Sequence, residues 1–370
     1  MLFFIIMKKT LSSVDLIALV SEFQILTRAK LQQLYHPSKT EFCLHFHIPG
    51  KGKQYMRIIA GKMINFADEK RSSINPSGLA MLLRKHISGA IVEKVWQKDS
   101  ERIVVFDLAV RDKKFHLVVE LFSKGNLVLC DNDWKILALQ SWQLRQSGAV
   151  KMKQEFKFPD SRVDWKNISE SEFSDLIGKS EKKNLATAIA TDMGVGGLFA
   201  EEICIRSGID SKKQVTEVVV DEIKKLYASL IGLIKELSEA KGFVYEKEIS
   251  PVKISVPRVG KLVEEKESLS LALDTVNPLV KISPYDKKIA KVVNIIKKQE
   301  EAIGNIDDAI EANSRKGDLV YEKYADISKL QEVVKTMSKT KDWDEIKKEL
   351  ESLKKVISVD LKKKTVVLDL

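Results

Sequence analysis

The sequence has few of the residues that build covalent or metal-bound scaffolds. It holds three cysteines, Cys43, Cys130 and Cys204, which lie far apart and form no CxxC pair. An odd number of isolated cysteines argues against a disulfide framework and against a zinc ribbon. His45 and His47 stand two residues apart, with no third metal ligand evident in the sequence. We therefore expect a reducing, cytoplasmic location, no metal site and no cofactor.

Long apolar runs are also missing. The opening MLFFIIM is a seven-residue run, whereas a membrane-spanning helix needs about 20 apolar residues. No basic residue precedes it, so its flanks do not fit a secretory signal, and Met7 is an alternative start. We expect no membrane partner, and the missing signal argues against a surface adhesin.

Motifs that carry catalysis are absent as well. The sequence contains no Walker loop, no nucleophile elbow and no HExxH motif. Without such a motif, nothing in the sequence supplies the groups for covalent or metal-assisted chemistry. We therefore expect a protein that acts by binding and is not an enzyme.

Positive charge is concentrated at one end of the chain. The 370 residues are 44% hydrophobic, which predicts two or three folded domains. The formal net charge is +10, and residues 1–150 hold 22 of the 62 Lys and Arg but only 13 of the 52 Asp and Glu. A positive field on one domain favours nucleic acid or an acidic surface as the partner, with solubility as the alternative explanation.

The first 160 residues carry helix and strand patterns in turn. A Ser12–Ser13 cap and helical spacing predict one helix over residues 10–35, with a break near Thr27. Two β-rich runs on either side of Pro49–Gly52 predict a hairpin over residues 41–65. A helix after Pro76 and then a series of β-branched runs predict an antiparallel meander, and thus an α+β domain that ends near residue 160.

The rest of the chain is mostly helical in pattern. Residues 168–240 contain four helical segments, and residues 241–284 read as a connector with a strand or two. Ile289, Ile296, Ile303 and Ile310 then recur every seven residues, which predicts one strand of a coiled coil. Residues 326–358 offer no matching seam. The partner of this coiled-coil strand would be a helix beyond residue 370 or the same strand of a second copy of the chain in a homodimer.

A glycine hairpin joins the second and third helical segments of residues 168–240. Its residues are Gly194, Val195, Gly196 and Gly197. A helix, a Gly-x-Gly turn and a second helix direct backbone N–H groups outward, which suits a phosphate oxygen without reading a base. Two helices that simply turn at glycine are the alternative.

The pattern NLATAIATDMGVGGLFAEEICIRSGID resembles a helix-hairpin-helix element, as found after the first domain of the formamidopyrimidine DNA glycosylases. Those enzymes attack with an N-terminal proline and carry a zinc ribbon. This chain begins MLFFIIM or MKKT and has no four-cysteine cluster. A non-catalytic DNA-binding protein related to these glycosylases therefore stays open as the alternative function.

A second resemblance runs through most of the chain. The order and spacing of six segments resemble the NFACT family of ribosome quality-control proteins, known as RqcH in bacteria and NEMF in animals. These segments are LSSVDLIALVSEF (11–23), LAMLLRKHISGAIVEKVWQ (79–97), ERIVVF (101–106), VVELFSKGNLVL (118–129), GVGGLFAEEICIRSGID (194–210) and KGDLVYEKY (316–324).

The resemblance implies an α+β multidomain fold. It would comprise a glycosylase-like, β-rich N-terminal domain, a helix-hairpin-helix domain and a coiled-coil helix with a small α/β middle domain. On this sequence the parts would be residues 7–165, 168–240, a connector 241–284, a coiled-coil strand 285–318 and a middle domain 319–370.

The resemblance also implies partners and site residues. The partners would be tRNA and a large ribosomal subunit obstructed by peptidyl-tRNA, whose stalled chain is extended without a template. The family's tRNA-binding positions would fall on Asp15, Arg84, Lys85, Glu101, Arg102, Gly125 and Asn126. Glu101 stands where many members have aspartate. We expect the basic residues to contact RNA phosphates and Gly125–Asn126 to shape a tight turn.

These residues also have ordinary structural interpretations. An arginine can hold a phosphate or a base edge at two points, and a carboxylate beside it can accept from a base amine or a ribose hydroxyl. A Glu101–Arg102 pair that opens a strand is nevertheless often a surface pair. Asp15 alone fits a charge at a helix N-terminus.

Overall fold

The structure is a computed structural model that describes residues 8–73, 75–145, 148–160, 163–276, 284–339, 341–351, 356–360 and 365–368. The chain divides into two compact units, residues 1–280 and 281–370. The opening MLFFIIM, about which the sequence raised the question of a membrane span, lies outside the described residues.

The first unit is built on a nine-stranded sheet in the order β4-β3-β2-β1-β5-β6-β7-β8-β9. Every pair of neighbours is antiparallel, which confirms the predicted α+β class with a large antiparallel sheet. Its strands are β1 (Lys30–Ser38), β2 (Glu41–Ile48), β3 (Gly52–Ile59), β4 (Met63–Ala67), β5 (Ile91–Gln97), β6 (Ile103–Val110), β7 (Lys113–Glu120), β8 (Asn126–Asp131) and β9 (Ile136–Leu139). Helix α2 (Gly78–Ile87) precedes β5, and a hairpin of β10 (Gln143–Arg145) and β11 (Gly148–Val150) follows β9.

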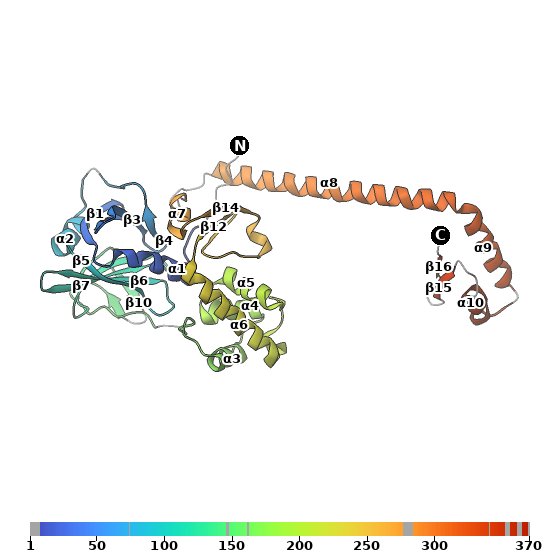
Figure 1. The fold of residues 1–370 in the computed structure, drawn as a ribbon, viewed down its shortest axis with the longest axis horizontal. Coiled ribbons are helices and arrows are strands. Elements are labelled where there is room, and N and C mark those ends of the chain that lie inside the picture. Colours follow the sequence, from blue (N-terminus) through green and yellow to red (C-terminus); the bar gives the residue numbers. More distant parts are fainter. Residues whose placement is uncertain are drawn as a thin grey trace. The chain divides into compact units, whose positions relative to one another are not determined.

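Side-chain alternation gives this sheet two faces. Phe42, Leu44 and Phe46 of β2 lie in a core that also contains Phe106 and Leu117 from the other half of the sheet. The two halves therefore pack against each other, as the two layers of strands in Figure 1 show. A second, smaller cluster covers the outer face of β6–β9 with aromatic side chains of residues 134–158.

The first helix is shorter than the sequence predicts. Helix α1 (Ser13–Phe23) continues only as the short η1 (Gln24–Leu26), and β1 begins at Lys30. The backbone turns at Arg28, whose φ is +70°. Leu31 N–H then donates to the carbonyl of Ala90, next to β5. Pairing with a distant strand thus overrides the helical spacing after Thr27, and the prediction for residues 28–35 was wrong.

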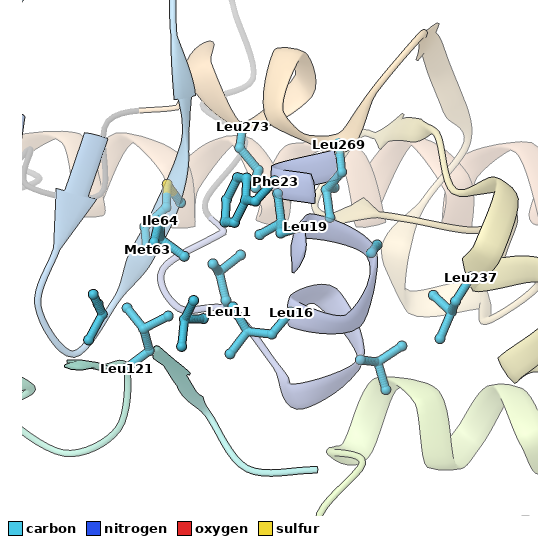
Figure 2. Close-up of a cluster of buried hydrophobic side chains, with 14 of the residues drawn as sticks. Leu11, Leu16, Leu19, Phe23, Met63, Ile64, Leu121, Leu237, Leu269 and Leu273 are labelled. Carbon is cyan, nitrogen blue, oxygen red and sulfur yellow. The ribbon is translucent and has the colours of Figure 1, made fainter. Parts of the chain in front are cut away.

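Helix α1 lies at the centre of the first unit. Leu16, Leu19 and Phe23 are completely buried. Figure 2 shows side chains from sheet, loop and helix around them, namely Met63, Ile64, Leu121, Leu237, Leu269 and Leu273. Each fully buried Leu or Phe side chain contributes about 1.5–3 kcal/mol. Because α1 contacts so many segments, it fixes their relative positions.

Residues 168–240 form helices, as the sequence predicts. They are α3 (Glu170–Gly178), α4 (Leu185–Ala188), the π-helical η2 (Ile189–Met193), α5 (Gly197–Ser207), η3 (Val215–Glu217), α6 (Val220–Glu236) and η4 (Leu237–Glu239). The glycine hairpin lies between η2 and α5. Helix α5 packs on α6, and η4 packs on α1.

Residues 241–276 hold more structure than the predicted connector. They form β12 (Gly242–Tyr245), β13 (Ile249–Ser250), η5 (Pro257–Val259), β14 (Leu262–Lys266) and α7 (Leu269–Asp274), with the three strands in one sheet. The carboxylate of Glu22 on α1 accepts hydrogen bonds from the backbone N–H of Leu269 at 2.6 Å and of Ser270 at 3.2 Å. This segment is therefore docked on α1.

The second unit consists of α8 (Pro284–Glu322), α9 (Tyr324–Met337), α10 (Trp343–Glu351) and a hairpin of β15 (Val356–Asp360) and β16 (Thr365–Leu368). The predicted heptad seam lies on α8, a single helix of 39 residues. Ile303 and Ile310 on this seam are 57% and 60% exposed. The pairing of this helix in a coiled coil stays a prediction.

The turn at Gly125 packs closely against the turn at Gly61 in the first unit. Gly125 has φ +68°, and a Cβ added there would lie 1.8 Å from the backbone nitrogen of Gly61. We expect Gly125→Ala to lower the free energy of unfolding by more than the ~1–2 kcal/mol of a left-handed alanine alone. Gly208→Ala is the control, since Gly208 has φ +70° and no atom near the added Cβ. Urea unfolding of both variants measures the difference, and equal losses would contradict the close contact.

Candidate functional site

A pocket of about 590 Å³ opens between the sheet, the start of α1 and the glycine hairpin. Its wall combines residues 8–15, the bend at residues 100–102 and residues 193–199. Of the residues singled out in the sequence, the pocket brings together Asp15, Glu101, Arg102 and the hairpin Gly194–Gly197. Segments about 90 residues apart along the chain therefore meet at one site.

The hairpin reaches the pocket through two glycines in unusual conformations. Gly194 has φ +84°, and Gly196 has φ +88° with ψ 155°, a region open in practice only to glycine. Helix α5 then starts at Gly197 with Gly196 as its N-cap, and glycine has no side chain to cap the first turn. The positive end of the α5 dipole thus faces the pocket.

The start of α1 meets the start of α5. Ser12 caps α1, and the Ser13 hydroxyl donates a hydrogen bond of 2.9 Å to the carbonyl of Gly194. An added Cβ at Gly196 would lie 3.9 Å from Ser12 Cβ, so the two helix starts are in contact. Two helix N-termini therefore border the same pocket, which is a favourable arrangement for oxygen-rich ligands.

Glu101 and Arg102 lie in the bend before β6, and both are half-buried. The amide nitrogen of Gln97 donates to two carbonyls, that of Ser13 at 3.1 Å and that of Glu101 at 2.8 Å. Sequence reasoning missed Gln97, which looks like an ordinary strand-end residue. This one side chain holds the Glu101–Arg102 bend against the start of α1.

Asp15 is completely buried below the pocket. Its carboxylate accepts from the backbone N–H and the hydroxyl of Ser12, both at 2.8 Å, and pairs with Lys8 Nζ at 3.1 Å. Lys8 also pairs with Glu248 at 3.0 Å and donates to the carbonyl of Ile249. Asp15 is thus a positioning residue, and its burial does not fit the expected direct contact with tRNA.

The charge of Lys8 is retained in spite of its burial. Burial alone would lower the pKa of Lys8, but the carboxylates of Asp15 and Glu248 outweigh it, and the pKa is raised above its ordinary value. Neither Lys8 nor Glu248 was singled out in the sequence. The only feature of the sequence that could have indicated the role of Lys8 is its position, four residues before the predicted helix cap at Ser12.

The pocket is mixed in charge. Among the described residues that line the pocket, Lys8 and Arg102 are the cations and Asp15, Glu101, Asp160 and Glu248 are the carboxylates. Two of these carboxylates are engaged with Lys8. A site of this kind is not a plain phosphate clamp. Arg102 can hold a phosphate or a base edge, and Glu101 and Asp160 can accept from base amines and ribose hydroxyls.

The other predicted residues lie outside the pocket lining. Arg84 on α2 donates from Nε to the carbonyl of Leu34 at 2.7 Å, and its guanidinium lies 5.5 Å from the ring centre of Tyr35. Lys85 is exposed on the same helix. Arg84 and Lys85 therefore belong to a separate surface.

Gly125 and Asn126 form hydrogen bonds with the backbone of neighbouring segments. Gly125 N–H closes a turn onto the carbonyl of Phe122, as the expected tight turn requires. Asn126 is completely buried, and its side-chain amide exchanges two hydrogen bonds with the backbone of Ser141, at 2.9 and 3.1 Å. A direct RNA contact by Asn126 does not fit this burial, so we assign it a structural role.

Within the described ranges, no group of three or more His, Cys, Asp or Glu residues is placed to hold a metal ion. No described helix is both long and apolar enough to cross a membrane. Burial raises the pKa of the Cys130 and Cys204 thiols to about 12 each, so neither is a reactive thiolate at neutral pH.

Comparison with known proteins shows the family to which the chain belongs. The family model of the NFACT N-terminal and middle domains matches residues 12–367. The chain belongs to the NFACT family. The archaeal Rqc2 homolog aRqcH of Methanocaldococcus jannaschii is 29% identical over 92% of this chain and 54% of its own length. The human ribosome quality control complex subunit NEMF is 21% identical over 92% of this chain and 35% of its own length.

The NFACT chain thus spans about half the length of the archaeal relative, and less of the human one. Two solved structures share its fold over about 70% of the chain. The N-terminal part of a fibronectin/fibrinogen-binding protein from Streptococcus suis matches with TM-score 0.58 at 18% identity, over 72% of this chain and 98% of that one. A fibrinogen-binding protein from Staphylococcus aureus matches with TM-score 0.59 at 15% identity, over 71% and 97%.

The buried pair of Lys8 and Asp15 gives a stability prediction. Asp15→Asn removes one charge partner of a buried cation, and we expect a loss of about 3 kcal/mol in the free energy of unfolding. Asp175→Asn is the matched control, because its pair with Lys179 is on the surface at 72% and 79% exposure, where such pairs contribute about 0–1 kcal/mol. Chemical denaturation measures both, and similar small losses would contradict the buried network.

The pH dependence of this network follows from the raised pKa of Lys8. A lysine whose pKa is higher in the folded state stabilises the fold fully below its unfolded pKa near 10.5. That contribution is lost only as the pH rises through the folded value. The difference in unfolding free energy between the native chain and Lys8→Met should therefore be constant from neutral pH to about 10 and shrink above it. A difference in unfolding free energy that already shrinks near pH 8 would be inconsistent with a raised pKa of Lys8.

Proposed function

We propose that this NFACT protein is a ribosome-associated quality-control factor. In this proposal it binds a large ribosomal subunit obstructed by peptidyl-tRNA, binds tRNA, and supports template-free extension of the stalled chain at its C-terminus. Membership in the family supports the proposal, as do relatives that are named ribosome quality control complex subunits in human, fly and yeast.

The observation that carries the tRNA part of the proposal is the composition of the pocket. Arg102 and two helix N-termini stand beside Glu101 and Asp160 in one cavity. Cationic groups and N–H groups suit phosphates, while carboxylates repel phosphates and instead accept from base amines and ribose hydroxyls. A ligand that satisfies both sets of groups is an RNA segment with accessible bases and sugars.

The protein would act by binding alone. Three of the described serines that line the pocket donate structural hydrogen bonds from their hydroxyls: Ser12 to the buried carboxylate of Asp15, Ser13 to the carbonyl of Gly194 and Ser100 to the carboxylate of Asp164. In this proposal the ribosome supplies the chemistry of peptide transfer, and the chain holds the tRNA in place.

A second candidate function is non-catalytic binding of duplex DNA. It is favoured by the arrangement of η2, the glycine hairpin and α5, which we propose to be a helix-hairpin-helix element on a glycosylase-like first domain. Such a hairpin contacts phosphates without reading bases. The carboxylates around Arg102 weigh against this candidate, because a continuous duplex backbone offers them no donor.

The first test compares tRNA with duplex DNA. We expect the native chain to prefer tRNA to duplex DNA of equal length by about tenfold at moderate salt, and Arg102→Ala to remove this preference, since a two-point arginine contact contributes about 1–3 kcal/mol. Fluorescence anisotropy across a salt series measures both ligands. Arg315→Ala is the matched loss of one positive charge. Arg315 lies on α8, and in the interactions described its side chain forms an ion pair only with Glu311 of the same helix.

Equal binding of both nucleic acids by the native chain, unchanged in Arg102→Ala, would favour the DNA-binding alternative. An Arg315→Ala effect as large as that of Arg102→Ala would indicate general electrostatic attraction and would contradict a specific role for the pocket.

We further propose that the exposed seam of α8 packs in a coiled coil, as a homodimer of this chain. The apolar side chains of Val292, Ile296, Ile303 and Ile306 are all about half exposed or more. Sedimentation velocity should detect a dimer of the native chain at micromolar concentration and a monomer for Ile303→Lys. A native chain that sediments as a monomer throughout would contradict the dimer and leave the seam for another helix.

A further inference from the structure

The outer face of the first half of the sheet carries a diagonal row of aromatic rings. On β2, Phe42 and Leu44 point into the core, so the alternate residues Cys43 and His45 point to the outer face. Tyr35 on β1 pairs with Cys43, which places it diagonally across from His45. Tyr55 on β3 lies directly opposite His45, with ring centres 4.9 Å apart.

Cationic side chains surround this row. Lys70 Nζ lies 4.5 Å from the ring centre of Tyr35, and the Arg84 guanidinium lies 5.5 Å from it. The pKa of His45 is lowered, first by burial and then by the positive charges of Lys53, Lys70 and His47. The lysines belong to different segments, β3 and the loop after β4, so they converge here through the fold.

Few carboxylates offset these charges. Glu41, on the same face of β2, is buried and paired with Arg57 at 2.7 Å. Glu69 is exposed beside Lys70 in the chain. The rings of Tyr35 and Tyr55 are half-buried, while Lys53 and Lys70 are exposed. The face thus combines accessible aromatic surface with net positive charge.

Together these residues form what we call the tyrosine face, made of Tyr35, His45 and Tyr55 with Lys53, Lys70 and Arg84. We propose that the tyrosine face binds a single-stranded RNA segment, with bases stacked on Tyr35 and Tyr55 and phosphates held by Lys53, Lys70 and Arg84. Aromatic rings on a sheet flanked by cations suit unpaired bases, since every base has a face that stacks. None of these six residues lines the pocket at Arg102.

The site goes beyond the proposed tRNA pocket and gives Arg84 a specific role. Its guanidinium is oriented by the hydrogen bond to the carbonyl of Leu34 and by the ring of Tyr35. An oriented guanidinium loses less side-chain entropy when a phosphate binds. The tyrosine face would therefore hold a strand of RNA separate from the segment that enters the pocket.

The test uses a fluorescein-labelled uridine oligonucleotide of about 12 nucleotides, long enough for one such site, and the full chain. We expect Tyr55→Leu to weaken binding about tenfold, the loss typical of one stacked base. Lys70→Gln should weaken binding and lower the salt slope by about 0.7. Trp142→Leu and Lys225→Gln are the controls, because Trp142 and Lys225 are exposed on other elements. Circular dichroism and thermal melting check that each variant is folded.

Three outcomes would overturn the proposal. The native chain could fail to bind the oligonucleotide, or Tyr55→Leu and Lys70→Gln could bind it as the native chain does. An abasic strand of equal length that binds as tightly would show that the bases are not stacked. If Tyr55→Leu does not fold, Lys70→Gln together with the abasic strand decides the question.

Arg102→Ala separates this site from the pocket. In the Arg102→Ala background we expect Tyr55→Leu and Lys70→Gln to weaken oligonucleotide binding by the same factors as in the native chain, because no residue of the tyrosine face lines the pocket. Should the pocket fail as a tRNA site, normal oligonucleotide binding that depends on Tyr55 and Lys70 would still support the tyrosine face.

Discussion

The hydrogen bonds and ion pairs at the start of α1 hold the candidate site together. Lys8 and Asp15 join this start to Glu248 and Ile249. Ser13 joins it to the hairpin at Gly194, and Gln97 joins it to the bend at Glu101. Three segments that are remote in sequence are thus positioned by a stretch of eight residues, Lys8–Asp15.

Because this network is buried, it carries a desolvation penalty, and its groups are held in fixed positions. A lysine and an aspartate that leave water must be paired and fully hydrogen-bonded, or the desolvation penalty is not recovered. Both oxygens of Asp15 accept hydrogen bonds, and Lys8 has two carboxylates and a carbonyl around it. Because the charges of Lys8 and Asp15 are matched by these partners, this part of the network is rigid. This rigid base holds Arg102, Glu101 and the two helix starts, which line the pocket and which we propose to contact the ligand.

Much of the fold was accessible from the sequence because local patterns agree with the tertiary structure there. The β-rich runs of β2, β3 and β5 to β8, the cap at Ser12 and the helices of residues 168–240 all have their expected form. Prediction failed where long-range contacts decide the structure. Residues 30–35 fall within the predicted helix but belong to β1, which pairs with β2 and β5, and residues 241–276 gain their structure by docking on α1.

The site was predictable to a similar degree. Family resemblance located Asp15, Glu101 and Arg102, and the glycine spacing located Gly194–Gly197, all of which meet in the pocket. Neither the resemblance nor the glycine spacing distinguished residues on the surface of the pocket from buried residues that support them, because a sequence motif does not show which of its side chains are buried. Asp15 and Asn126 are buried, while Gln97, Lys8 and Glu248 support the site from positions with no motif of their own.

The most direct test of one shared site is hydrogen–deuterium exchange of the full chain with and without tRNA. We expect the peptides covering residues 97–104 and 192–200 to gain protection together at the same tRNA concentration, whereas residues 220–236 of α6 do not change. Protection of only one of the two peptides, or of neither while tRNA is bound, would contradict the claim that the Glu101–Arg102 bend and the glycine hairpin hold the same ligand.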